Sequence, residues 1–206
     1  MFSMLRDIKN VDLFIILNVI LFCAFCIIYY YERFLYYRGR ANIHEFFIYA
    51  LIIIILILIA WYLLRNLHIP NRMLILLQIG ILAHFAGGFV PIDGQRLYDA
   101  YIIGIGFDKY VHFYNSFVSA YLVNHLFKIF SVSSGHPGFR NLVLLMCVLG
   151  GGAVVEIVEY LVLLTVDDVG VGDYHNNMRD MIANLSGCMT FITLNGIVSK
   201  LWNRPL

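Results

Sequence analysis

The stretch EFFIYALIIIILILIAWYLL (residues 45–64) has a single charged side chain, Glu45, at its first position, and continues with isoleucine, leucine and aromatic residues. An α-helix rises about 1.5 Å per residue, so a run of about 20 residues crosses the ~30 Å hydrocarbon core of a bilayer. The stretch therefore predicts a membrane-spanning helix. It sets the class of fold in which the rest of the chain is interpreted.

The composition of the whole chain agrees with this prediction. Of the 206 residues, 61% are apolar and 13% are charged, and the mean hydropathy is +0.81. Charged residues make up about 25% of an ordinary soluble domain, so this chain carries about half the usual complement. The net charge of +1, without a basic face, argues against a nucleic-acid-binding protein.

Further apolar runs predict the other helices of one integral membrane domain, residues 1–206. We expect an all-α, polytopic transmembrane bundle of about six spans, with helices at about residues 11–31, 45–64, 73–90, 108–130, 141–166 and 177–202. Six spans place both termini on one side, where eight Lys and Arg residues lie against six on the opposite side. Positive charge favours the cytoplasm, so we predict a cell (inner) membrane protein with a cytoplasmic N-terminus.

The stretch FDKYVHFYN (residues 107–115) opens the fourth predicted helix with several polar side chains. Asp108, His112, Asn115 and Ser119 follow one another at i, i+4, i+7 and i+11, which places them on one helix face. An acid and a histidine one turn apart can share a proton, a hydrogen bond or a metal ion. Ionisable groups inside membrane helices are rare and usually functional.

The predicted topology brings polar residues of four helices toward one membrane face, because helix three ends where helix four begins and helix five ends where helix six begins. His84 and Glu156 would both lie roughly 10–15 Å inside the boundary, from the rise of a helix. The candidate polar pocket is His84, Asp108, His112, Glu156, Glu159, Asp180 and Asn184, and its accessory residues are Lys109, Asn115, Asp173 and Arg179.

Isolated carboxylates at this depth would cost ~2.5–3.5 kcal/mol each, so these acids must be solvated, paired or bound to a metal. One interpretation is a structural ion network with Lys109, Arg179 and the histidines. A second is a pocket for a head group or substrate. A third is a divalent metal site, for which imidazole and carboxylate ligands are suitable, formed by His84, Asp108, His112 and Glu156.

Four short motifs in this order resemble the YjdF-like family of bacterial and archaeal inner-membrane proteins. They are HFAGG (residues 84–88), FDKYVHF (residues 107–113), EIVEY (residues 156–160) and GDYHNNMRDM (residues 172–181). Asn176 stands where an acid commonly follows the Gly-Asp pair. More loosely, the sequence looks like the VanZ-like pattern, through Asp108-Lys109 with His112, a mid-chain glutamate, and Asp180 with Asn184 and Gly187.

The YjdF-like resemblance implies a multi-pass membrane protein without an established activity. VanZ-like proteins are associated with glycopeptide-antibiotic tolerance, which points toward the cell envelope. Our leading hypothesis is a pocket that opens to the outer face and binds a lipid or envelope-precursor head group, helped by Arg33, Arg38 and Arg40. The alternatives are a metal-dependent hydrolase or transferase acting on a lipid phosphate, and a proton-coupled transporter.

Overall fold

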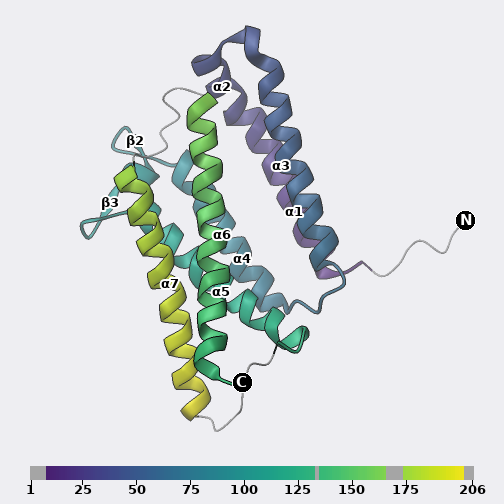
Figure 1. Ribbon diagram of the computed structural model, residues 1–206. Coiled ribbons are helices and arrows are strands. Elements are labelled where there is room, and N and C mark those ends of the chain that lie inside the picture. Colours follow the sequence, from purple (N-terminus) through teal and green to yellow (C-terminus); the bar gives the residue numbers. More distant parts are fainter. Residues whose placement is uncertain (1–7, 133–134, 166–173, 202–206) are drawn as a thin grey trace, which may run out of the picture. The chain divides into compact units, whose positions relative to one another are not determined.

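The computed structural model describes residues 8–132, 135–165 and 174–201, and Figure 1 shows that they are almost entirely helical. The chain divides into two compact units. The first unit takes in the described chain up to Leu74 and residues 162–165. The second takes in residues 75–161 together with the last helix, α7 (Tyr174–Leu201).

The first unit begins with a long helical segment that ends later than the sequence predicts. Helix α1 (Asn10–Phe25) continues through a π-helical segment (Cys26–Tyr30) into α2 (Tyr31–Arg38). The predicted helices at residues 11–31 and 45–64 leave a loop over residues 32–44, and this prediction is wrong for residues 32–38. No glycine or proline interrupts the helix before Gly39, whose φ of +73° suits a residue without a side chain.

A short 3₁₀ turn (Arg40–Asn42) leads to the apolar helix α3 (Ile43–Leu64). Near its end, Arg65 pairs with Asp12 of α1 at 2.8 Å, and Trp61 Nε1 donates a hydrogen bond of 2.7 Å to the same carboxylate. The hydrogen bond from Arg65 to Asp12 raises the pKa of the guanidinium above its usual value. These contacts hold the start of α1 against the end of α3, beside a small core that includes Val11 and Ile15.

The second unit contains two consecutive β-hairpins between α4 (Asn71–Phe89) and α5 (Phe107–Ile129). Strands β1 (Pro91–Ile92) and β2 (Gln95–Arg96) form the first hairpin. A 3₁₀ turn (Leu97–Asp99) then leads to the second hairpin, which is formed by β3 (Tyr101–Ile102) and β4 (Ile105–Gly106). The predicted helices at residues 73–90 and 108–130 leave residues 91–106 as a loop, whereas most of this segment is hydrogen-bonded.

Helices α5, α6 (Pro137–Thr165) and α7 surround the core of the second unit. The buried core residues are Ala120, Leu144, Val148, Cys188 and Phe191. Gly187 of α7 lies directly against the main chain of α5, where a methyl group would collide with the carbonyl oxygen of Phe113. Small residues allow such close approach in membrane helices. This contact fixes the relative height of α5 and α7.

The structure confirms an all-α helical bundle with membrane-spanning character. Among the described residues, four helical segments are long and apolar enough to cross a membrane, namely Asn10–Tyr36, Arg40–Leu64, Pro137–Val158 and Tyr174–Leu201. Their bounds lie close to the predicted ones, although α6 and α7 begin a few residues earlier. Helices α4 and α5 are not among these four segments, so their crossing of the membrane, and with it the count of six spans, stays a prediction.

Candidate functional site

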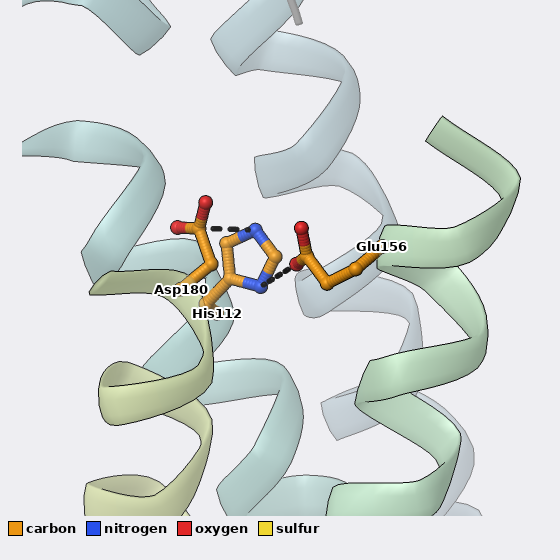
Figure 2. A group of neighbouring side chains, drawn as sticks. All are labelled: His112, Glu156 and Asp180. Atoms are coloured by element: carbon orange, nitrogen blue, oxygen red, sulfur yellow. Dashed lines mark ion pairs between the residues drawn. The ribbon is translucent and has the colours of Figure 1, made fainter. Parts of the chain in front are cut away.

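The imidazole of His112 lies between two buried carboxylates from different helices, as Figure 2 shows. Its Nε2 is 3.5 Å from Asp180 Oδ1 on α7, and its Nδ1 is 3.9 Å from Glu156 Oε1 on α6. Asp180 is only 1% exposed and Glu156 is 7% exposed. Three residues that are far apart in the sequence thus meet in the interior of the second unit.

Close packing of α7 on α5, together with a side-chain contact between α7 and α6, brings this cluster together. Gly187 allows α7 to approach α5, and Gly152 of α6 lies against the side chain of Asn184 on α7. Ser116 of α5 donates a hydrogen bond of 2.5 Å to the main-chain oxygen of Asn184. Asp180 lies one turn before Asn184 on the same helix, so α7 presents its carboxylate to His112.

Lys109 joins the cluster to a second set of polar contacts. Its Nζ donates to Asp180 Oδ1 at 2.6 Å, to Asp108 Oδ2 at 2.7 Å and to Asn176 Oδ1 at 2.7 Å. Asn176 in turn donates from Nδ2 to Asp180 Oδ2 at 2.8 Å. Buried charges are stable only where partners replace the lost water. Lys109 therefore compensates the charge of both Asp108 and Asp180, and Asn176 orients both Lys109 and Asp180 through its hydrogen bonds.

The arrangement around His112 restricts the chemistry that it can perform. The two distances to the carboxylates exceed the 2.7–3.2 Å of ordinary N–H···O bonds, and each contact is an ion pair only when the imidazole is protonated. One ligand atom each of His112, Glu156 and Asp180 lies within 4.8 Å of the others, which is a suitable spacing for a metal ion. The two ring nitrogens face opposite carboxylates, however, so a shared ion could use only one of them.

The structure places the other predicted pocket residues around this cluster. His84 Nδ1 lies 2.5 Å from the hydroxyl of Tyr98, outside the three-residue group. Asn115 packs against Gly80 of α4. Asn184 is buried beside His112, and its Nδ2 has no hydrogen-bond partner within the described part of the chain.

The remaining residues predicted for the pocket and its surroundings include Arg179, Asp173 and Glu159. Arg179 is exposed on α7. Asp173 lies outside the described residues. The side chain of Glu159 is also outside what the structure describes, although its main chain belongs to α6. In the predicted divalent set of His84, Asp108, His112 and Glu156, His84 also contacts Tyr98 and Asp108 also contacts Lys109, and metal binding by this set stays a prediction.

A cleft of about 990 Å³ opens directly beside Lys109. The segment from Tyr98 to Gly106 forms one wall, and the first turns of α5 and α7 form the other. Its polar lining residues include charged groups of both signs and three phenol groups; they are Tyr98, Asp99, Tyr101, Asp108, Lys109, Tyr110, Asn176 and Arg179. The buried ion network therefore reaches a surface cavity through Lys109 and Asp108.

Sequence reasoning missed two residues of this region, Asn176 and Tyr98. Asn176 precedes Asp180 by four positions, and residues four apart lie on the same helix face, so that spacing is the signal that could have found it. Tyr98 had no such signal, because its position beside His84 depends on the path of the hairpins between α4 and α5.

Comparison with known proteins gives one match. A model of the family described as "Predicted membrane protein (DUF2238)" matches residues 12–200, which is nearly the whole chain. No curated protein and no solved structure matches. The match covers α1 to α7 and therefore includes every residue of the cluster around His112.

Proposed function

The chain belongs to the membrane-protein family described as "Predicted membrane protein (DUF2238)", and from this premise we propose that it binds the polar head group of a lipid or an envelope precursor. The proposed binding site is the cleft beside Lys109. The observation that carries the proposal is that this cleft adjoins a buried network of ion pairs. A network held in this way gives a cavity a fixed arrangement of charge before any ligand arrives.

The lining of the cleft supports a phosphate-bearing ligand. Arg179 is exposed, and no hydrogen bond or ion pair joins its side chain to another described residue. A guanidinium can make two parallel hydrogen bonds to a phosphate. The hydroxyl of Tyr98 and the acids Asp99 and Asp108 add polar groups for the rest of the head group, although Asp99 is already paired with Arg96 at 2.8 Å.

The proposal also includes a narrower family, a location and an orientation in the membrane. The order of motifs from His84 to Asp180 supports a YjdF-like protein, and the VanZ-like resemblance remains a hypothesis about the cell envelope. A location in the cell membrane with a cytoplasmic N-terminus rests on the distribution of Lys and Arg in the sequence. The three arginines of residues 33–40 lie in the first unit, so their part in binding also stays a prediction.

Binding to purified protein in detergent tests the proposal. The probes are a short-chain phosphatidylglycerol and a short-chain polyprenyl phosphate, which separate a lipid from an envelope-precursor source, and the readout is the ligand-induced rise in Tm. Loss of a charge-assisted hydrogen bond of about 1.5–3 kcal/mol should weaken binding of the preferred probe by Arg179→Gln roughly 10- to 100-fold.

Lys200→Gln is the control for this experiment, because Lys200 is also on α7 and exposed, but in its last turn. It should bind the probes like the unaltered protein. If Arg179→Gln and Lys200→Gln bind both probes equally well, the cleft is not the binding site. If neither probe raises the Tm of the unaltered protein, the head-group proposal itself fails.

The spacing of His112, Glu156 and Asp180 favours one second candidate, a metal-dependent hydrolase or transferase acting on a lipid phosphate. Imidazole and carboxylate suit divalent ions such as Zn²⁺ and Mn²⁺, and a bound ion could polarise a phosphoryl oxygen. Calorimetric titration with these two ions tests this candidate. Binding should disappear in His112→Gln, and a protein that takes up neither ion rules the candidate out.

A further inference from the structure

The two hairpins between α4 and α5 have the same backbone design. In each, two short strands are joined by two residues with positive φ, which are Asp93 (+49°) and Gly94 (+79°) in the first and Ile103 (+52°) and Gly104 (+75°) in the second. Two consecutive positive φ values are the signature of a type I′ turn. Because the two backbones are alike, the residues at equivalent turn positions of the two hairpins can be compared directly.

Their turn sequences differ in a way that backbone preference does not explain. Asp-Gly is a preferred pair for a type I′ turn, because aspartate tolerates the left-handed region. An isoleucine at this φ is an outlier, since its branched Cβ crowds the main chain. The second hairpin thus holds Ile103 in an unfavourable conformation where aspartate or asparagine would be relaxed.

The exposure of the apolar Ile103 side chain to water is also unfavourable. It is 93% exposed, and Tyr101 on the same hairpin is 72% exposed. Ile102 and Ile105 are exposed as well, so the whole hairpin presents an apolar surface. In the first hairpin the corresponding turn carries the charged Asp93. An apolar environment around the second hairpin would remove the exposure of Ile103 to water.

The position of the second hairpin identifies that environment. It lines the cleft together with Asn176 and Arg179, which lie in the first two turns of α7, and Figure 1 shows β3 near that end of α7. Tyr174–Leu201 is long and apolar enough to span a membrane, and the first turns of a helix that spans a membrane lie at its boundary. Tyr110 of α5 fixes the hairpin there by donating a hydrogen bond of 2.8 Å to the carbonyl of Ile102.

We propose that the β3–β4 hairpin inserts Ile103, with Tyr101 and Ile102, into the interfacial layer of the lipid bilayer. Tyrosine is enriched at this depth because its ring is apolar and its hydroxyl is polar. The insertion holds one wall of the cleft against the membrane surface. It depends on the membrane location of the chain and not on the ligand of the cleft.

Tryptophan fluorescence in phosphatidylcholine vesicles tests the insertion. Ile103→Trp and Asp93→Trp place the same probe at equivalent turn positions of the two hairpins, and the signal of the two native tryptophans is subtracted. We expect blue-shifted emission from Ile103→Trp and its loss when the vesicles contain brominated phosphatidylcholine. Asp93→Trp should emit at longer wavelength and lose little intensity.

Two results would overturn the proposal. Equal quenching of Ile103→Trp and Asp93→Trp would show that the second hairpin has no special contact with lipid. Blue-shifted emission from Ile103→Trp without quenching would place the hairpin against protein, either a second copy or a partner. If Ile103→Trp does not fold, Tyr101→Trp exchanges one aromatic residue for another on the same hairpin, and the same two outcomes apply to it.

Discussion

Replacing Lys109 with methionine removes an ammonium group on which two acids depend, while keeping a side chain of similar length. Nζ lies 2.6 Å from Asp180 Oδ1 and 2.7 Å from Asp108 Oδ2, and the side chain of Asp180 is only 2% exposed. Removing one partner of a buried ion pair costs about 3–5 kcal/mol, because the remaining charge is left without water or a counter-ion. We expect Lys109→Met to lower the free energy of unfolding by about this amount.

Replacing the partner, Asp180, should lower the free energy of unfolding by less, because Lys109 has other acceptors and would not be left without a partner. In Asp180→Asn the ammonium keeps Asp108 and the side-chain oxygen of Asn176, both at 2.7 Å. The loss is then one charge-assisted hydrogen bond, about 1.5–3 kcal/mol. The double variant, Lys109→Met with Asp180→Asn, should cost less than the sum of the two single changes, since it no longer leaves a charge on Asp180.

Urea unfolding of the protein in detergent, followed by circular dichroism, measures these differences. Lys128→Met is the control, because Lys128 is exposed in the last turn of the same helix and its replacement should change the free energy of unfolding by no more than about 0.5 kcal/mol. If Lys109→Met costs no more than Lys128→Met, the acids do not depend on Lys109. Additive single and double variants would show that Lys109 and Asp180 are not coupled.

Three further predictions concern the packing that supports the site, and all can be measured as thermal or urea unfolding in detergent. Gly187→Ala should lower the free energy of unfolding by about 1–3 kcal/mol, because the new methyl group meets main-chain atoms of α5. The control is Gly196→Ala on the same helix, whose methyl group meets no atom within 4 Å, so that it should be neutral or stabilising by up to about 1 kcal/mol. Equal stability of the two variants would refute the close contact. Ser116→Ala should cost about 1 kcal/mol, through the lost hydrogen bond to Asn184, and an unchanged midpoint would mean that this bond contributes nothing. Asp12→Asn should lower the Tm, because Arg65 and Trp61 lose a charged acceptor, while no change in Tm would show that the α1–α3 contact does not depend on that charge.

The helices of this protein could be predicted from the sequence because each apolar run carries its own signal. Residues 45–64 are apolar over a length that only a membrane helix uses, and α3 indeed covers Ile43–Leu64. The errors concern the polar segments between the apolar runs. Residues 32–38 continue a helix because no residue before Gly39 stops it, and Asp93-Gly94 is a turn pair within a segment that looks like a loop.

The polar side chains of the candidate site could also be chosen from the sequence, since ionisable groups in apolar helices are conspicuous. Spacing along α5 predicts that Asp108 and His112 lie on one face. It does not predict that Lys109, one position away, is the residue that bridges to Asp180. A side chain of that length can reach around its helix, and the direction it takes depends on which acceptors the neighbouring helix provides.

The sequence by itself determined that this chain is a helical membrane protein and which helices carry ionisable groups, because hydropathy and helical spacing are properties of neighbouring residues. Only the tertiary structure decided which of those groups meet. His112 lies between Asp180 and Glu156, and His84 contacts Tyr98 instead. The depth at which α7 packs on α5 follows from the contact between Gly187 and the main chain of Phe113. That contact joins residues far apart in the chain, so no local pattern could reveal it.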